Sequence, residues 1–354
     1  MKSEDRVLGW DLLRGLCALL VAAYHLMYWQ DIAAVHAFGS YGVYLFFILS
    51  GASLAYTYAK SFELKSFSYR RFLWARYLRL APLYVALMVL ALPWKLTQSG
   101  PSVELLTIYL TNATFLFGFY NPAAHAVLVG GWSLGIEVIF YLLFPLFMLS
   151  LQHRPKAICL VLVVVLVQVA WVCMTVAQPD GYEKNFLRYF QAPAFAAYFV
   201  LGCIIGSIKL KNASQLQLSS ISGLSILLSG FAALFLMSPE KAGDELIGWR
   251  GLASASLCLF MVYIASKISP EKLFKYVAQK FGDSTYGVYL LHPVIFFGSK
   301  LIVFPLLGVP DPVNWQLFNR CLFAFFVIAV SAVLALGSEK YFEKPLRSLL
   351  KSKI

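Results

Sequence analysis

The chain has 354 residues, of which 60% are hydrophobic, 16% are aromatic and only 13% are charged. An ordinary soluble domain has about 25% charged residues, so this composition excludes a soluble globular protein and indicates a polytopic helical membrane protein. The formal net charge of +12 would favour a nucleic-acid partner in a soluble protein. In a membrane protein, however, basic residues are concentrated in cytosolic loops, so they first indicate how the chain is oriented in the membrane. We therefore expect a lipid bilayer around the chain and no nucleic-acid partner.

Ten apolar stretches are long enough to cross a bilayer as helices, which takes about 20 residues each. We therefore predict an all-α fold, a polytopic transmembrane helical bundle of about ten spans, in a single integral-membrane domain over residues 1–354. A shorter apolar stretch at 104–118 predicts a re-entrant or interfacial helix. The ten predicted spans are 8–29, 40–59, 76–94, 132–151, 157–177, 193–209, 218–237, 247–267, 283–306 and 317–338.

Basic residues are concentrated in alternate loops of this layout. If the N-terminus is cytosolic, 22 of the 29 lysine and arginine residues lie on the cytosolic side, as the positive-inside rule requires. We therefore predict that both termini are cytosolic and that the loop 95–131 lies outside. The six cysteines are scattered through apolar stretches without a CxxC spacing, so neither a disulfide framework nor a metal site is predicted.

The first span carries ionisable side chains where a bilayer makes them costly. Asp11, Arg14 and His25 interrupt its apolar run, so we expect it to remain as a span and not to be cleaved as a signal peptide. Function is the default interpretation of such residues. On an α-helix the eleven-residue step from Arg14 to His25 leaves the two side chains within about 20° of one face and roughly 16 Å apart. A small-residue stripe separates them, formed by Gly15, Ala18 and Ala22. This stripe would let another helix, or a thin extended ligand, approach the backbone closely.

Six segments of the chain resemble the motifs of one family and occur in that family's order. They are RGLCALLVAAYH at 14–25, GVYLFFILSG at 42–51, RYLRLAPLY at 76–84, WSLGIEVIFYLLFP at 132–145, TYGVYLLHP at 285–293 and FEKPLR at 342–347. Through them nearly the whole chain resembles the membrane-bound acyltransferase family three, the integral-membrane O-acyltransferases. The resemblance implies transfer of an acyl group, usually acetyl, from cytosolic acyl-CoA to a hydroxyl of a glycan or related acceptor. It also implies functional roles for Arg14, His25, Arg76 and Arg79.

Two positions depart from the pattern of that family. An acidic residue often follows two places after the glycine of the second motif, where this chain has Tyr44. A second carboxylate often follows the one in the fourth motif, where this chain has Val138. Both departures bear on the acceptor side of the implied site, and neither changes an arginine or His25.

His25 is predicted to be the general base of the reaction. A hydroxyl that attacks a thioester must lose a proton, and an imidazole is suited to accept it near neutral pH. Two alternatives stay open. His25 could instead carry the acyl group covalently, or it could be a neutral imidazole that is only hydrogen-bonded within the bundle.

Arg14, Arg76 and Arg79 are predicted to bind the donor. Arg76 and Arg79 are three residues apart, so they share a helix face on which two guanidinium groups could hold the phosphates of CoA. Arg14 lies at the inner end of its span, on the stripe that leads to His25. The plainer interpretation of all three is that they anchor the topology under the positive-inside rule.

Glu137 is predicted to be a second catalytic residue, because it is the only carboxylate of the fourth span and could orient His25 or hold acceptor hydroxyls. Ser133 and Tyr141 lie one helical turn before and after it on the same face. His292, in the segment YLLHP, could line the same cavity. We predict that these three residues bind the acceptor substrate. Their alternative roles are structural, as hydrogen-bonding groups of the bundle or, for His292, as part of a helix-breaking His-Pro step.

These features predict an acyl-CoA-dependent O-acyltransferase of a bacterial inner membrane, with acetyl-CoA as the leading donor and no metal cofactor. The acceptor would be a glycan, a lipid-linked saccharide or another cell-envelope molecule reached from the outer side, and envelope-polysaccharide machinery is a further candidate partner. Two other classes of function stay open. A secondary transporter could use Arg14, His25 and Glu137 as a substrate site or proton relay. A non-catalytic scaffold would leave these buried charges without a role.

Overall fold

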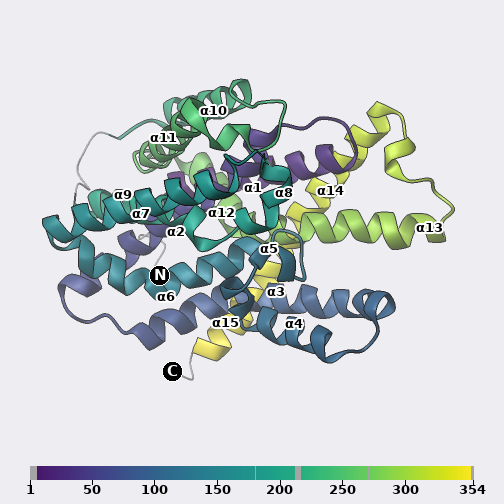
Figure 1. Cartoon of the computed structure of the whole chain (residues 1–354), viewed down its shortest axis with the longest axis horizontal. Coiled ribbons are helices and arrows are strands. Elements are labelled where there is room, and N and C mark those ends of the chain that lie inside the picture. Colours follow the sequence, from purple (N-terminus) through teal and green to yellow (C-terminus); the bar gives the residue numbers. More distant parts are fainter. Residues whose placement is uncertain (1–5, 180, 212–216, 270, 352–354) are drawn as a thin grey trace.

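The structure is a computed structural model that describes residues 6–179, 181–211, 217–269 and 271–351. Helices make up most of these residues, which contain no strand beyond an isolated bridge between Leu218 and Ile268. The helices pack into one bundle in which most of them run roughly parallel or antiparallel to one another (Figure 1). The predicted all-α polytopic bundle is therefore confirmed.

Each of the ten predicted spans corresponds to a helix. Within the described ranges, eight helical segments are long and apolar enough to cross a membrane. Two apolar helices are shorter, α9 (Ala196–Lys211) and α10 (Ser220–Leu236). The chain is thus an integral, multi-pass membrane protein, while the number of ten spans stays a prediction. The eight longer segments are α1 (Leu8–Trp29), α2 (His36–Glu63), α3 (Tyr69–Ser99), α6 (Trp132–Leu151), α7 (Arg154–Thr175), α11 (Gly248–Ala265), α12 (Lys272–Gly298, continued to Leu306) and α14 (Leu317–Ser338, continued to Lys351).

Two of the long helices are interrupted by π-helical turns. The first turn, Ser299–Val303, joins α12 to α13 (Phe304–Leu306), and the second, Glu339–Glu343, joins α14 to α15 (Lys344–Lys351). Such turns widen the helix locally and are frequent at functional sites. The remaining elements are α4 (Val103–Ala113), α5 (Pro122–His125), α8 (Gly181–Tyr189) and 3₁₀ helices at Leu116–Phe119, Ala192–Ala194, Asp244–Leu246 and Pro312–Asn314.

The most extensive helix contact joins α2 to α9, and glycines make it possible. A Cβ atom on Gly202 would lie 2.2 Å from the backbone oxygen of Ile48, and one on Gly206 would lie 2.1 Å from that of Ala52. No residue with a side chain fits at these distances, so small residues let the two backbones touch, as in many membrane helix pairs. α1 then packs along α2 on one side and α12 on another.

The segment 104–118, predicted to be re-entrant or interfacial, folds as α4 and the 3₁₀ helix that follows it. The Ser102 hydroxyl accepts a hydrogen bond from the Leu105 amide at 3.0 Å and so caps α4. α4 turns back along α3 (Figure 1). With 11 residues it is too short to cross a bilayer alone. Its position relative to the membrane stays a prediction.

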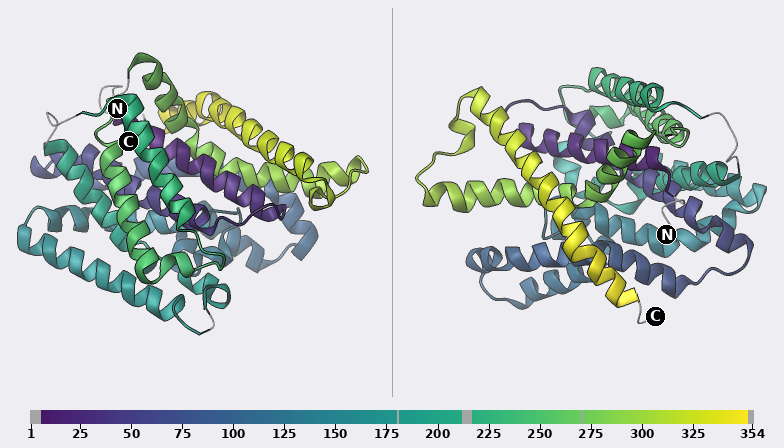
Figure 2. Two further views of the ribbon diagram at one scale, coloured as in Figure 1. Left: turned by 90° about the horizontal axis from the view of Figure 1, so that it is seen from above. Right: turned by 180° about the vertical axis from the view of Figure 1, so that it is seen from behind.

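The two ends of the described chain lie together at one end of the bundle (Figure 2). Asp283 of α12 joins them, because its carboxylate accepts from Arg6 Nη1 at 2.9 Å and from Lys344 Nζ at 3.2 Å. This proximity agrees with termini on a common side of the membrane, but that the side is cytosolic stays a prediction. The terminal residues 1–5 and 352–354 lie outside the described residues.

Candidate active site

α1 carries the predicted functional residues near its two ends. Asp11 and Arg14 lie in its first two turns, and His25 lies in its last two. Because α1 packs along both α2 and α12, each of these groups meets partners from helices distant in sequence. Two sites result, an ionic cluster near the start of α1 and a histidine pair near its end.

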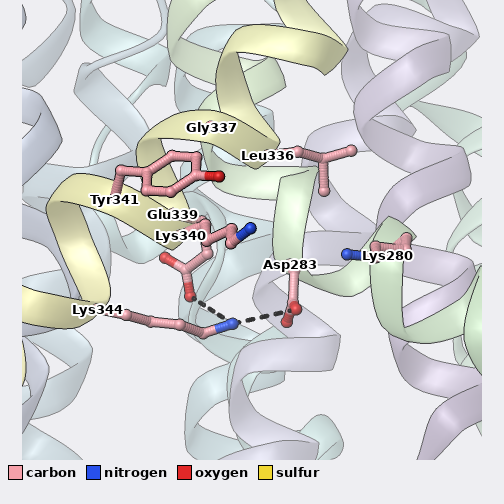
Figure 3. Close-up of a pocket in the computed structure, with 8 residues that line it drawn as sticks. All are labelled: Lys280, Asp283, Leu336, Gly337, Glu339, Lys340, Tyr341 and Lys344. Carbon is pink, nitrogen blue, oxygen red and sulfur yellow. Dashed lines mark hydrogen bonds and ion pairs between the residues drawn. The ribbon is translucent and has the colours of Figure 1, made fainter.

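The ionic cluster gathers charged side chains from α3, α12, the start of α1 with the segment before it, and the π-helical turn and α15 that follow α14. Figure 3 shows the part of it in which Lys344 Nζ lies 3.2 Å from the carboxylate of Asp283 and 3.7 Å from that of Glu339, beside a pocket of about 260 Å³. Each basic residue of the cluster lies within 4 Å of an acidic one, and each of the three carboxylates is shared by two or three basic residues. Its members are Arg6, Asp11, Arg14, Arg79, Asp283, Glu339, Lys344 and Arg347.

Arg14 is held within the bundle. Its Nη1 donates to Asp11 Oδ1 at 3.3 Å, and its Nη2 donates to the backbone carbonyl of Leu49 at 3.0 Å and to the Ser53 hydroxyl. These contacts tie α1 to α2. The donor-binding role predicted for Arg14 stays a prediction, and the structure adds a structural role beside it.

The two predicted arginines of α3 have different surroundings. Arg79 Nη1 lies 3.9 Å from Glu339 Oε1. The guanidinium of Arg76 lies over the ring of Tyr58, 5.8 Å from its centroid, and its buried Nε has no hydrogen-bond partner among the described residues. A buried donor without a partner is costly. Arg76 therefore has unused capacity to bind an anion.

At the other end of α1, His25 meets His292 of α12. The Nδ1 atom of His25 lies 3.0 Å from Nε2 of His292, and the two ring planes differ by 13°. His25 also stacks on Trp29, with ring centroids 4.9 Å apart and planes 3° apart. His292 is 1% exposed, whereas His25 is partly exposed. Two residues predicted to belong to the site, 267 positions apart, thus form one hydrogen-bonded pair.

Glu137 has partners other than the expected one. Its Oε1 accepts from the Ser50 hydroxyl at 2.6 Å and from the Tyr141 hydroxyl. Within the described residues the partner of His25 is His292, so the expected contact between Glu137 and His25 is not formed. The helical periodicity correctly placed Tyr141 beside Glu137, but it could not say that this face of α6 meets α2.

Ser133 belongs to the surroundings of the histidine pair. Its hydroxyl is hydrogen-bonded to the Tyr289 hydroxyl at 3.0 Å, and both hydroxyls lie 3.0 Å from the Gly130 carbonyl oxygen. The Tyr289 ring lies 6.4 Å from the ring of His292. The structure therefore brings Ser133 and His292 into one region. The substrate-binding roles of Ser133, Tyr141 and His292 stay predictions.

The small-residue stripe of α1 is occupied by protein. A Cβ atom on Gly15 would lie 2.4 Å from the Cβ atom of Phe281 in α12. Ala18 and Ala22 are 1% and 0% exposed. Of the two interpretations of the stripe, the structure favours close packing of another helix, and it leaves no room for an extended ligand at Gly15.

Two acidic members of the ionic cluster, Asp283 and Glu339, are not among the predicted site residues. Both were visible in the sequence, because each carboxylate stands at the edge of a long apolar stretch, where charges are unusual. In the described part of the chain, no three His, Cys, Asp or Glu side chains come together in a way that could hold a metal ion. That the reaction needs no metal remains a prediction.

Known proteins resemble this chain over most of its length. The O-acetyltransferase OatA of Staphylococcus aureus (strain NCTC 8325 / PS 47) is 27% identical over 337 residues, which cover 86% of this chain and 53% of that protein. The peptidoglycan O-acetyltransferase OatA of Listeria monocytogenes serovar 1/2a (strain ATCC BAA-679 / EGD-e) is 25% identical over 367 residues, which cover 95% of this chain and 55% of that protein. The chain therefore spans about half the length of these relatives. No solved structure matches it.

A family model described as an acyltransferase domain matches residues 7–337. This match includes α1, the α3 arginines, the histidine pair and all of α12 and α13, and it ends within α14. Because the match covers nearly the whole sequence, the chain belongs to the acyltransferase family three.

Proposed function

We propose that the chain transfers an acyl group, with acetyl as the leading candidate, from cytosolic acyl-CoA to a hydroxyl of a cell-envelope glycan reached from the other face of the membrane. The observation that carries this proposal is the histidine pair, in which a partly exposed imidazole is held by a buried one in a chain of an acyltransferase family. The two relatives are named as O-acetyltransferases, and one name specifies peptidoglycan. These names support an acetyl group and a glycan acceptor.

In this proposal His25 is the general base. The acceptor hydroxyl gives its proton to an imidazole nitrogen of His25 while its oxygen attacks the carbonyl carbon of the thioester. The tetrahedral intermediate collapses with breakage of the C–S bond. CoA leaves as a thiolate and takes the proton from His25, so the products are the acceptor ester and free CoA.

The donor would bind at the end of the bundle that holds the ionic cluster. Arg76 has an unpaired Nε, and Arg79 is 38% exposed with only a 3.9 Å contact to Glu339. Phosphate oxygens of CoA would approach these guanidinium groups more closely than Glu339 approaches Arg79, and arginine favours such bidentate hydrogen bonds to phosphate. Because Gly15 is packed against Phe281, the route from these arginines to His25 would lie off the small-residue stripe.

The test uses purified protein in proteoliposomes, with labelled acetyl-CoA on one side and soluble glycan strands from peptidoglycan on the other. His25→Ala should lower acetyl transfer by at least ~10²-fold, because general-base assistance is lost, while calorimetry should still detect acetyl-CoA binding. His153→Gln, an exposed histidine before α7, serves as the matched control. Normal transfer by His25→Ala would overturn the assignment. Movement of intact saccharide without ester formation would favour the transporter.

A further inference from the structure

We infer that His292 is a positioning residue that fixes the tautomer of His25, so that the proton-accepting atom of His25 is its Nε2. This inference rests on the proposed function, in which His25 is the general base. It is drawn from a chain of two hydrogen bonds that runs from the Val288 carbonyl through His292 to His25.

The first of the two hydrogen bonds involves a backbone carbonyl oxygen, which can accept a hydrogen bond but cannot donate one. His292 Nδ1 lies 2.9 Å from the backbone carbonyl oxygen of Val288, one turn earlier in α12. A carbonyl oxygen carries no proton, so Nδ1 of His292 must be the protonated nitrogen of its ring. A neutral imidazole has a single N–H group, so Nε2 of His292 is then an acceptor.

The second hydrogen bond determines which ring nitrogen of His25 carries the proton. The Nδ1 atom of His25 and the Nε2 atom of His292 are 3.0 Å apart, whereas the ring centroids are 5.3 Å apart and the planes differ by 13°. The nitrogens are thus much closer than the ring centres, as they are in an in-plane N–H···N bond and not in a face-to-face stack. Because Nε2 of His292 accepts, Nδ1 of His25 donates. Neutral His25 therefore keeps its free lone pair on Nε2.

His292 accepts from His25 only when its own imidazole is neutral, and the surroundings of His292 favour the neutral form. The side chain is 1% exposed and lies among aromatic rings, with centroids of Trp29 at 6.1 Å and Tyr289 at 6.4 Å. No carboxylate of the described residues makes a hydrogen bond or ion pair with either imidazole of the pair. A buried charge without a counter-charge is strongly disfavoured.

The two histidines differ in exposure and in hydrogen bonding, as expected for a catalytic base and the residue that positions it. His25 is partly exposed and its ring is held flat against Trp29, so it can meet a substrate in a fixed orientation. His292 is buried and bonded on both nitrogens, so it has no free atom for chemistry. Catalytic bases are commonly oriented by a third group that fixes their tautomer. Here the Val288 carbonyl and His292 together supply that group.

The tautomer can be read directly in the wild-type protein. The chain has five histidines, so nitrogen-15 labelling of histidine followed by solid-state NMR gives few signals, and those of His25 are identified by their loss in His25→Ala. We expect a protonated Nδ1 and an unprotonated Nε2 for His25 at neutral pH. A neutral His25 that is protonated on Nε2 would overturn the inference.

A matched pair of substitutions tests the positioning role in catalysis. The amide oxygen of His292→Gln can reach the place of Nε2 and accept from His25, whereas the shorter His292→Asn reaches only the place of Nδ1. We expect His292→Asn to lower kcat by about 10²-fold, as for a base with the wrong tautomer, with little change in the KM for acetyl-CoA. His292→Gln should recover most of the rate. Equal kcat in the two variants would overturn the positioning role.

The same assays separate this inference from the proposed function. If His25→Ala retains acetyl transfer, the general-base assignment fails whichever tautomer the spectra report. If His25→Ala loses transfer but the two His292 variants behave alike, only the positioning role of His292 fails. The wild-type spectrum decides the tautomer even if a His292 variant does not fold.

Discussion

Arg79 of α3 lies 3.9 Å from the carboxylate of Glu339, a residue that is 4% exposed in the π-helical turn after α14. The same carboxylate meets Lys344 at 3.7 Å and accepts a hydrogen bond from Arg347. One buried anion therefore pairs with three cations and joins α3 to α15. Losing this carboxylate should cost most at Arg347, which is 14% exposed, because Arg79 and Lys344, which are 38% and 54% exposed, keep much of their hydration.

The first prediction concerns this anion. Glu339→Gln should lower the free energy of unfolding by about 1–3 kcal/mol, because the little-exposed Arg347 loses its charged partner while Arg79 and Lys344 stay partly solvated. Thermal unfolding of the detergent-solubilised protein measures the effect. Glu63→Gln, at the exposed end of α2, is the control and should change stability by no more than about 0.5 kcal/mol. Equal unfolding midpoints for the two variants would contradict the role of Glu339.

The second prediction concerns the contact between α1 and α12. Gly15→Ala should destabilise the protein by about 1–3 kcal/mol, because its Cβ would overlap Phe281 and force the helices apart. Gly337→Ala in α14 meets no atom within 4 Å and should be neutral or stabilising by about 0.5–1 kcal/mol. Thermal unfolding compares the two. A harmless Gly15→Ala would show that the stripe is open and restore it as a path for a ligand.

The third prediction separates two arginines that the sequence grouped together. Arg76→Ala should weaken acetyl-CoA binding by about 1.5–3 kcal/mol, the range for a lost charge-assisted hydrogen bond, and should leave stability nearly unchanged because Arg76 has no ion-pair partner among the described residues. Arg76→Lys should restore binding only partly, since lysine cannot bind bidentately. Arg14→Ala should instead lower the unfolding midpoint, because the hydrogen bonds of Arg14 to Asp11 and to the Leu49 carbonyl of α2 are lost, although Asp11 keeps Arg6 as a donor.

Calorimetric titration with acetyl-CoA, together with thermal unfolding, tests this separation. If Arg76→Ala binds acetyl-CoA as tightly as the wild type does, Arg76 is not a donor-binding residue. If Arg14→Ala unfolds at the wild-type temperature, its bonds to α2 contribute little, and the interpretation as a pure ligand contact regains support.

The fourth prediction concerns orientation in the membrane. In a background without the six native cysteines, Ser99→Cys should react with an impermeant thiol reagent in intact cells, because the loop after α3 is predicted to lie outside. Ser348→Cys in α15 should react only after permeabilisation. Both side chains are exposed, so burial does not limit labelling. Reaction of Ser348→Cys in intact cells would reverse the predicted orientation.

The sequence predicted the helices well because apolar length is a local property. All ten apolar stretches are helical, yet the boundaries differ where polar residues continue a helix beyond its apolar part. α2, for example, runs from His36 to Glu63, whereas hydropathy marked only 40–59. Hydropathy detects the residues that suit a bilayer, and helix formation extends past them at both ends.

The sequence predicted on which helix each candidate residue lies, but it could not predict which residues are paired. Arg14 and His25 were correctly placed on one helix as unusual polar residues. A helical wheel gives the direction of each side chain from its own axis, but it contains no information on which helix lies there. His25 meets α12 and Arg14 meets α2, partly because a long arginine side chain reaches around its helix. For the same reason the sequence could not show that Glu137, one of whose two predicted roles is to orient His25, lies beside Ser50.

The glycines of α9 have a mechanical consequence. Gly202 and Gly206 bring the α9 backbone directly against the backbone carbonyls of α2. No side chain lies between the two backbones at these points, so a change of side-chain rotamer cannot accommodate sliding of one helix along the other. Two helices joined in this way are expected to move as one rigid body. If the protein rearranges to expose His25 first to one substrate and then to the other, α2 and α9 would form the stationary frame. Sliding would then be expected at helix contacts in which a side chain lies between the backbones, such as that of Phe281 in α12 with Gly15 in α1.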